Sequence, residues 1–263
     1  MMTVLQAYDI HLSYNKKKIL DNISLCIEEK KITSIIGPNG SGKSTLLKAL
    51  SKSLTPSSGT VCFNGKDLNN ISTKELARHL AVLCQMPEAP QGVAVKDLVT
   101  FGRFPHQSWW KDTSKEDNSV VDWAIKQTGL KELEHRPIHT LSGGERQRAW
   151  ISMALAQQPK TLILDEPTTY LDIAHQLEIL ELIKRLNKDA ALSVIMVLHD
   201  LNHAAKYSDY IVVLHQGKIV ADGNPAEVIT TDMLRTVFEV EADLWHDHEN
   251  KPFFVARGLI EKT

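Results

Sequence analysis

Residues 37–45 of the chain are Gly37-Pro38-Asn39-Gly40-Ser41-Gly42-Lys43-Ser44-Thr45, which match the pattern G-x-x-x-x-G-K-[ST] at every fixed position. The apolar residues 32–36 before this stretch predict a buried β-strand, and residues 46–50 after it predict a helix. A glycine-rich loop between a strand and a helix is the context in which this pattern binds phosphate. Because both flanks agree with the motif, an ordinary glycine-rich turn is the less favoured interpretation.

Each part of this phosphate loop has a physical task in holding a nucleoside triphosphate. Its three glycines let the backbone curl until several N–H groups point at the phosphates, and the following helix adds partial positive charge. Lys43 is expected to reach the β- and γ-phosphates, and the Ser44 hydroxyl to bind Mg²⁺. The predicted nucleotide-binding residues of the loop are Gly37, Pro38, Asn39, Gly40, Ser41, Gly42, Lys43, Ser44 and Thr45.

Length, charge and cysteine content narrow the class of protein. With 263 residues, 43% of them hydrophobic, the chain can form an α/β domain with a packed core. A formal net charge of -2 provides no basic field for nucleic acid and no polybasic membrane anchor. The three cysteines lack C-x-x-C spacing, which favours a reducing compartment over disulfides or zinc. No leader and no apolar run of about 18 residues is found, so we expect a soluble chain.

Periodicity divides the chain into segments. Residues 4–14 and 19–27 alternate between polar and apolar side chains, and with residues 60–63 they predict an N-terminal antiparallel β-subdomain. Residues 86–157 show helical periodicity without a strong strand, which predicts an inserted α-helical subdomain. The predicted single nucleotide-binding domain thus comprises an α/β core with its β-subdomain (1–85 and 158–222), the α-helical subdomain (86–157) and a short C-terminal extension (223–263).

A pair of carboxylates follows another predicted strand. Residues 161–164 are a short apolar run, and Asp165 and Glu166 come directly after it. Open α/β sheets bind their ligands at the carboxyl ends of the strands. Hydrolysis of a Mg²⁺-nucleotide needs one acid to hold the metal and another to take a proton from the attacking water. We therefore assign the first task to Asp165 and the second to Glu166, in preference to two merely solvated acids.

Three more features have both a functional and a structural interpretation. The turn Ser142-Gly143-Gly144 opens an apolar helix, so its N–H groups can form a second anion site. His199 ends a predicted strand at 193–198 and can meet a γ-phosphate, although a structural histidine is the commoner case. Tyr14 ends a predicted strand ahead of the phosphate loop, where its ring can stack on adenine; a packing role explains this spacing equally well.

Over nearly its whole length the chain resembles the ATP-binding subunit of an ATP-binding cassette (ABC) transporter. The likeness is carried, in order, by the phosphate loop, Gln85, Leu141-Ser142-Gly143-Gly144-Glu145, Asp165-Glu166, Asp172 and His199. It implies a P-loop NTPase (RecA-like) α/β core, with ATP and Mg²⁺ as ligands. It also implies a head-to-tail homodimer that binds two ATP molecules, each between the phosphate loop of one subunit and the Ser142-Gly143-Gly144 turn of the other.

The resemblance implies a role for each matching residue. Tyr14 would stack on adenine, Gln85 would connect Mg²⁺ to the helical subdomain, and His199 would steady the γ-phosphate and the attacking water. Many members of the family have Ser-Ala-Leu-Asp where this chain has Thr169-Tyr170-Leu171-Asp172. Asp172 is still present in this segment, but the bulky Tyr170 alters the contact that the family pattern implies across the dimer. The implied catalytic residues are Lys43, Gln85, Glu166 and His199, and the implied metal ligands are Ser44, Gln85 and Asp165.

Residues 102–107, 147–157 and 169–176 further resemble the ATPases of iron–siderophore importers, a group that includes haem and cobalamin importers. In this family, the groove near Gln85 and residues 102–107 receives a helix of the membrane permease; simple packing of Phe104 and Pro105 is the alternative. The resemblance therefore predicts an ATPase at the cytoplasmic face of the membrane that drives iron–siderophore import through a permease. The resemblance further implies an extracellular or periplasmic substrate-binding protein as an indirect partner, and we expect no nucleic-acid partner.

Two other functions compete with iron–siderophore import. The first is the ATPase of a haem or cobalamin importer, which shares the same motifs. The second is a soluble, non-transport ABC ATPase acting on a macromolecule; one cassette without sustained heptads argues against it. A non-hydrolysing scaffold is disfavoured by the intact Glu166 and His199. Finally, residues 245–249 contain a His-x-His cluster that can bind a transition metal, but we expect a polar loop there and favour no metal.

Overall fold

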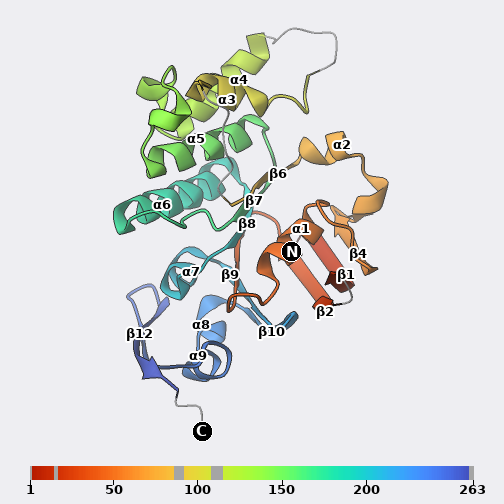
Figure 1. Cartoon of the computed structure of the whole chain (residues 1–263), viewed down its shortest axis with the longest axis vertical. Helices are drawn as coiled ribbons and strands as arrows, with labels where there is room; N and C mark the ends of the chain where they lie inside the picture. The colour runs from red at the N-terminus through yellow and green to blue at the C-terminus, as the bar shows by residue number, and fades with distance from the viewer. Residues whose placement is uncertain (1, 15–16, 86–91, 108–114, 261–263) are drawn as a thin grey trace. The chain divides into compact units, whose positions relative to one another are not determined.

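The computed structural model describes residues 2–14, 17–85, 92–107 and 115–260 (Figure 1). The chain divides into two compact units, the first formed by residues 1–70 and 193–263 and the second by residues 71–192. Both units contain strands as well as helices. Among the described residues, no helix has the length and apolar character needed to cross a membrane.

An antiparallel sheet forms the N-terminal part of the first unit. Its strands are β1 (Thr3–Tyr14), β2 (Lys17–Glu28), β4 (Ser58–Phe63) and β5 (Lys66–Asp67), in the order β2-β1-β4-β5. Buried and exposed side chains alternate in β2 from Ile23 to Ile27, as expected for a strand with one apolar face. The structure thus contains the antiparallel strands that the sequence pattern predicts.

The central strand of the other sheet in the first unit is β3 (Ile32–Ile36), whose residues are all buried. It pairs in parallel with β8 (Ser193–Val197) and with β9 (Tyr210–His215), and β10 (Lys218–Gly223) pairs antiparallel to β9. A strand with neighbours on both sides is expected to be apolar throughout, which explains the uninterrupted run in the sequence. The helices α1 (Lys43–Leu50) and α7 (Leu201–Tyr207) follow β3 and β8, and η1 (Leu68–Asn70) follows β5.

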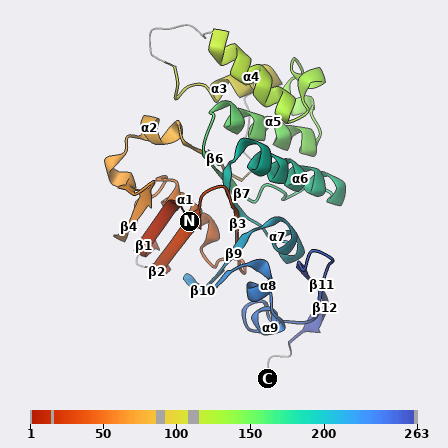
Figure 2. The ribbon, with the colours of Figure 1, turned by 180° about the vertical axis from the view of Figure 1, so that it is seen from behind.

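The C-terminal part of the first unit has more regular structure than the sequence indicates. It contains α8 (Pro225–Val228), α9 (Thr231–Phe238) and a hairpin of β11 (Val240–His246) and β12 (Pro252–Leu259) (Figures 1 and 2). The prediction of a polar loop over residues 245–249 is wrong for Trp245 and His246, which end β11. Trp245 stacks on Phe253 of β12, with ring centroids 5.9 Å apart. Among the described residues, no cluster of three or more His, Cys, Asp or Glu side chains is arranged to hold a metal ion.

The second unit contains two parallel strands, β6 (Leu80–Leu83) and β7 (Thr161–Asp165), and most of the helices. Within the described residues 92–107 and 115–157, the regular elements are helical, and α3, α4 and α5 lie together (Figures 1 and 2). The domain boundaries given by the sequence remain predictions. The helices of this unit are α2 (Thr73–Ala77), α3 (Val95–Phe101), α4 (Lys115–Gln127), η2 (Lys131–Leu133), η3 (Ile138–Thr140), α5 (Gly143–Ala156) and α6 (Ile173–Ala190).

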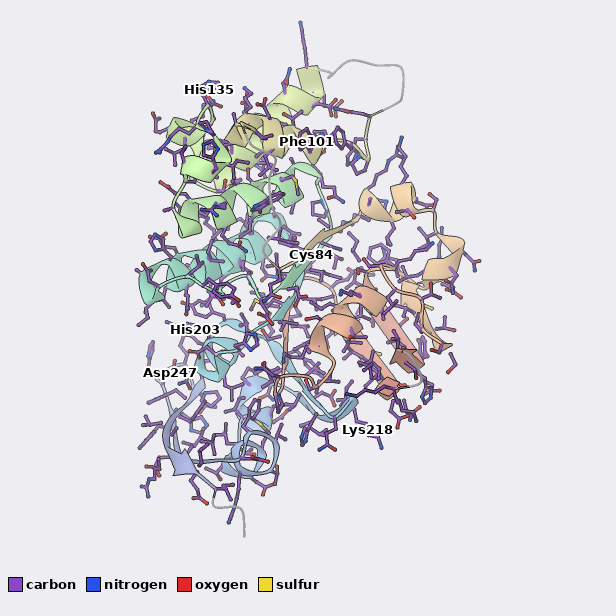
Figure 3. The ribbon with its side chains drawn as sticks, viewed as in Figure 1. Cys84, Phe101, His135, His203, Lys218 and Asp247 are labelled. Carbon is purple, nitrogen blue, oxygen red and sulfur yellow. The ribbon has the colours of Figure 1, made fainter. Side chains whose placement is uncertain are left out.

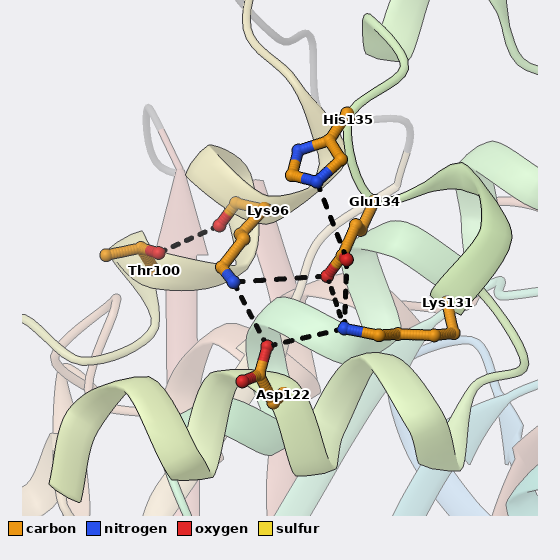
Figure 4. Close-up of polar contacts among 6 residues, drawn as sticks. All are labelled: Lys96, Thr100, Asp122, Lys131, Glu134 and His135. Atoms are coloured by element: carbon orange, nitrogen blue, oxygen red, sulfur yellow. Dashed lines mark hydrogen bonds and ion pairs between the residues drawn. The ribbon is translucent and has the colours of Figure 1, made fainter. Parts of the chain in front are cut away.

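Charged side chains join α3, α4 and the segment around η2 (Figure 4). Lys96 Nζ lies 3.1 Å from Asp122 Oδ1 and 4.0 Å from Glu134 Oε2. Lys131 Nζ lies 2.9 Å from a carboxylate oxygen of Glu134 and 3.8 Å from Asp122 Oδ1. The hydrogen bond from Lys131 is the main cause that lowers the pKa of the Glu134 carboxyl group. The network therefore favours the ionised form of Glu134 in the folded state.

Replacing Glu134 by Gln should make stability depend less on pH. Because the pKa of Glu134 is lowered in the folded protein, its charge stabilises the fold above the ordinary value of 4.5, and this contribution is lost as the pH falls through the lowered pKa. We expect Glu134→Gln to unfold at a slightly lower temperature than wild type near neutral pH and at the same temperature in strong acid. Circular dichroism during heating at several pH values measures this difference, and a difference that persists in strong acid would contradict the explanation.

Candidate functional site

The phosphate loop joins β3 to α1, and all three of its glycines have backbone conformations that other residues rarely adopt. Gly37 has φ 151°, and a Cβ atom there would lie 2.0 Å from the carbonyl oxygen of Leu214. Gly42 has φ 106° and is the N-cap residue of α1. A side chain at Gly37 would collide with the backbone of β9, so the tight turn between strand and helix requires glycine at this position.

Two polar side chains of the loop are buried. Lys43 is 5% exposed, and its Nζ donates hydrogen bonds to the carbonyl oxygens of Gly37, at 2.8 Å, and Pro38, at 3.0 Å. The Ser41 hydroxyl is also buried, and no described residue forms a hydrogen bond with it. An unsatisfied buried hydroxyl costs about 1–3 kcal/mol. A phosphate oxygen bound in the loop would remove that cost, so the loop fits the anion that its sequence predicts.

Three other predicted nucleotide-binding residues lie at the start of α1 and at the end of β1. Ser44 and Thr45, at the start of α1, are both partly exposed. Tyr14 is the last residue of β1, and its side chain lies outside what the structure describes. Its stacking on adenine therefore stays a prediction.

His199 is exposed at the end of β8 and lines a cavity of about 310 Å³. Residues at the start of α7 and residues of the C-terminal segment, including Leu234 and Phe254, form the rest of the lining. Asn202 of α7 bonds to the backbone of Phe254 in both directions, at 3.1 and 2.9 Å. The C-terminal hairpin is thus held next to the predicted phosphate-sensing histidine, a contact that no sequence pattern indicates.

In the second unit, the structure brings Gln85 and Glu166 into direct contact, although 81 positions separate them. Gln85 comes directly after Cys84, labelled in Figure 3 at the end of β6, and its Nε2 donates a hydrogen bond of 2.7 Å to Glu166 Oε2. Thr169 Oγ1 donates to the same oxygen at 3.1 Å. Asp165, the last residue of β7, is partly exposed beside Glu166. The role of Glu166 stays a prediction from the sequence, and the hydrogen bond that it receives from Thr169 was not predicted.

The signature turn, Ser142-Gly143-Gly144, begins α5 with a complete capping box. Glu145 N donates to Ser142 Oγ at 3.2 Å, and Ser142 N donates to Glu145 Oε2 at 2.8 Å. These bonds lower the pKa of the Glu145 carboxyl group, with the backbone N–H of Ser142 as the largest cause. The Ser142 hydroxyl also interacts with the Glu145 carboxylate and is the second cause of the lowered pKa. The turn is therefore a capped helix N-terminus at which Ser142 and Gly143 are exposed.

Asp172 begins α6 in a similar way and is connected to His175. The backbone N–H of His175 donates to Asp172 Oδ1 at 2.9 Å, and His175 Nδ1 lies 2.7 Å from the same oxygen. These contacts, the backbone hydrogen bond first, lower the pKa of Asp172. Tyr170 has φ 64° and is 78% exposed. The bulky residue that departs from the family pattern therefore points into solvent.

The segment containing Asp172 lies directly against the signature turn. A Cβ atom at Gly144 would be 2.3 Å from His175 Cδ2, and one at Gly143 would be 3.2 Å from Leu171 Cδ2. His175 was not among the predicted site residues, although it belongs to the 169–176 segment that resembles iron–siderophore ATPases. Its contact with Gly144 joins residues 31 positions apart and has no local sequence signal.

Comparisons with known proteins establish the class. The family model for ABC transporters matches residues 20–169, which is more than half of the chain. The chain therefore belongs to the ABC transporter family.

The particular relatives are ATP-binding proteins of importers. The iron(3+)-hydroxamate import ATP-binding protein FhuC of Bacillus subtilis is 46% identical over 99% of this chain and 97% of its own length. The petrobactin import ATP-binding protein FpuC of Bacillus anthracis is 45% identical, with 96% and 93% covered. The ferric enterobactin transport ATP-binding protein FepC of Escherichia coli is 42% identical, with 89% and 86% covered. They confirm the resemblance to ATP-binding subunits, and this chain is accordingly an ATPase.

Solved structures agree on the fold. The cbiO1 protein of Clostridium perfringens, part of the cbiONQ transporter complex, has a TM-score of 0.79 and 31% identity, covering 89% of this chain and 93% of its own. The dimeric structure of MJ0796, a bacterial ABC transporter cassette, has a TM-score of 0.74 and 26% identity, covering 84% and 98%. The predicted α/β fold of the P-loop NTPase class is therefore confirmed.

The contact between Gly144 and His175 predicts how a substitution changes stability. Gly144→Ala should destabilise the protein by about 1–3 kcal/mol, the usual effect of overpacking, because the new methyl group collides with the imidazole. The double variant Gly144→Ala with His175→Ala should recover most of this loss, since the obstructing ring is gone. Urea unfolding of the two single variants and the double variant measures the effect. Additive losses in the double variant would rule out the collision.

Proposed function

We propose that the chain is the subunit that hydrolyses ATP to drive import of an iron–siderophore complex through a membrane permease. The observation that carries the ATP site is the phosphate loop, with its buried Lys43 and the buried Ser41 hydroxyl for which no described residue is a partner. The proposed transport role is supported by relatives named for importing ferric hydroxamate, petrobactin and ferric enterobactin. These three compounds differ chemically, so the proposal stops at the substrate class.

ATP is held mainly by the backbone of the phosphate loop. Lys43 compensates the charge of the β- and γ-phosphates, and the Ser41 hydroxyl donates to a phosphate oxygen. Tyr14 stacks on the adenine ring. The other nucleotide-binding residues of this subunit are Gly37, Pro38, Asn39, Gly40, Gly42, Ser44 and Thr45.

The residues proposed for Mg²⁺ offer oxygen atoms, which this ion prefers. Ser44 contributes its hydroxyl and Asp165 its carboxylate. Gln85 bonds Glu166 through Nε2, and its Oε1 is the atom proposed to face the ion. When bound, Mg²⁺ neutralises charge on the phosphate oxygens.

Glu166 is the proposed general base. Its carboxylate takes a proton from the attacking water, and His199 orients that water relative to the γ-phosphate. Gln85 and Thr169 hold one carboxylate oxygen of Glu166 in place through their hydrogen bonds. Because one oxygen is held, the other carboxylate oxygen of Glu166 is already oriented before the nucleotide binds.

Two copies of the chain form the active unit in this proposal. The Ser142-Gly143-Gly144 turn and Asp172 of one subunit complete the ATP site of the other. A 26% identical cassette with a dimeric structure, and a second structure of that cassette with ADP and Pi bound, support this arrangement. ATP joins the subunits because each triphosphate contacts both, and hydrolysis removes the link so that they separate.

The permease is proposed to dock on the helical part of the second unit. Phe101 and Phe104 are 39% and 60% exposed, and their rings stack with centroids 5.3 Å apart (Figure 3 labels Phe101). Between them in the sequence, Arg103 is buried and bonds Asp117 Oδ1 at 2.7 Å and Ala156 O at 2.7 Å. Exposed aromatic side chains are enriched at protein-binding surfaces. The subunit thereby lies at the cytoplasmic face of the membrane, and a substrate-binding protein acts on the other side.

Glu166→Gln should separate ATP binding from hydrolysis. The amide cannot accept the proton of the attacking water, so turnover should fall by about 100-fold or more, while ATP still binds to the phosphate loop. Phosphate release and fluorescent-nucleotide binding measure the two steps. Lys43→Ala is the matched control, because it should weaken nucleotide binding instead. Near-normal hydrolysis by Glu166→Gln would refute Glu166 as the base.

Uptake in cells tests the transport role. Cells that lack this gene should fail to take up radiolabelled iron presented on at least one of a panel of siderophores that includes a hydroxamate and a catecholate. Wild type should restore that uptake and Glu166→Gln should not. If deletion leaves the uptake of every siderophore unchanged in a strain without parallel importers, the chain does not energise iron–siderophore import; haem and cobalamin would then be tested.

A further inference from the structure

His175 connects two parts of the second unit that the proposed dimer would present to the partner subunit. Its Nδ1 lies 2.7 Å from Asp172 Oδ1. Its Cδ2, on the opposite side of the ring, occupies the space next to Gly144, where a Cβ atom would lie only 2.3 Å away. The imidazole therefore spans the gap between the acid at the start of α6 and the glycine turn at the start of α5.

The geometry points to His175 as a positioning residue: we propose that it holds Asp172 and the signature turn together as one surface that closes on the ATP of the partner subunit. This inference rests on the proposed function, because it concerns the residues that complete the partner's site. His175 itself does not contact the nucleotide in this proposal. It acts through Asp172 and Gly144.

Hydrogen bonding fixes the orientation of the ring. The Asp172 carboxylate can only accept, so Nδ1 of His175 carries the proton in this contact. With Nδ1 held on Asp172, the Cδ2 side of the ring is directed at Gly144. Movement of the α6 start would therefore displace the signature turn, and the two would approach a partner as a unit.

The contact can be removed without removing the helix cap. Asp172 caps α6 through the backbone N–H of His175, at 2.9 Å, and Ala, Asn and Gln at position 175 all retain that group. The side chain of His175 is 35% exposed, so its truncation also removes packed surface, and the melting temperature of each variant has to be measured beside its dimer formation. The variants below therefore test the bridge made by the ring rather than the integrity of α6.

Closure of the dimer is the step that should respond. The phosphate loop belongs to the first unit and His175 to the second, so binding of ATP to a single subunit should not depend on the imidazole. Formation of the ATP-bound dimer should depend on it, because a loosened turn and a loosened Asp172 must be ordered when the partner closes. If His175 merely filled space, its removal would lower the stability of the fold and would not separate ATP binding by one subunit from formation of the dimer.

The experiment uses the full chain in a Glu166→Gln background, which should accumulate the ATP-bound dimer. His175→Ala, His175→Asn and His175→Gln are added, and the ATP concentration for half-maximal dimer formation is measured by analytical ultracentrifugation. We expect His175→Ala to raise that concentration by about tenfold, in line with loss of one hydrogen bond to a charged group. His175→Asn should recover part of the effect because its amide nitrogen can replace Nδ1, and His175→Gln should recover less.

Two controls make the outcomes distinct. Binding of a fluorescent ATP analogue to dilute, monomeric protein should be the same in all variants, and their melting temperatures should agree within a few degrees. Equal dimer formation by His175→Ala and its parent, or an equal loss of nucleotide binding by the monomer, would overturn the role of His175. Failure of Glu166→Gln alone to form a dimer with ATP would instead overturn the shared sites, and this inference with them.

Discussion

The close approach of the phosphate loop to β9 is the constraint on which the nucleotide site depends. Gly37 passes so near the carbonyl of Leu214 that no side chain fits. This path lets the chain leave β3 and enter α1 within a few residues, and it directs the N-terminus of α1 into the loop. Lys43, at the first position of α1, is consequently buried with its ammonium group on the loop carbonyls. Backbone geometry thus determines where positive charge is available for a triphosphate.

The second unit positions its proposed dimer-contacting residues at the capped N-termini of two helices. Ser142 begins α5 and Asp172 begins α6, and each side chain accepts from a backbone N–H three positions ahead. Capping fixes both termini, and the small size of Gly143 and Gly144 lets the two segments touch. Glu166, at the end of β7, is fixed by a different means, the hydrogen bonds from Gln85 and Thr169. The proposed binding and catalytic groups are therefore oriented before any ligand arrives.

Much of this arrangement could be predicted from the sequence because it depends on local patterns. The glycine spacing of the phosphate loop, the apolar run of β3 and the alternation in β2 each reflect a constraint within a few residues. Ser142 at the start of α5 is of the same kind, because capping preferences act over three or four positions. The predicted carboxylate at the end of β7 follows from the general position of ligands in α/β sheets.

The features that escaped prediction depend on contacts between distant residues. The bond from Gln85 to Glu166 joins the ends of two parallel strands, and the contact of His175 with Gly144 joins two helix starts. Neither leaves a periodic signal. The strand β11 was missed at Trp245 because polar neighbours in the sequence suggested a loop, whereas pairing with β12 and stacking on Phe253 stabilise the strand. Family resemblance supplied roles for single residues but not these contacts.

The most direct measurement for the central claim is the structure of the Glu166→Gln variant with ATP and Mg²⁺. If two chains share their nucleotides, each ATP will lie between the phosphate loop of one chain and the Ser142-Gly143-Gly144 turn of the other, with the Ser41 hydroxyl on a phosphate oxygen. A structure in which the phosphate loop of each chain binds ATP while the Ser142-Gly143-Gly144 turn of the other chain lies far from that nucleotide would contradict the shared site.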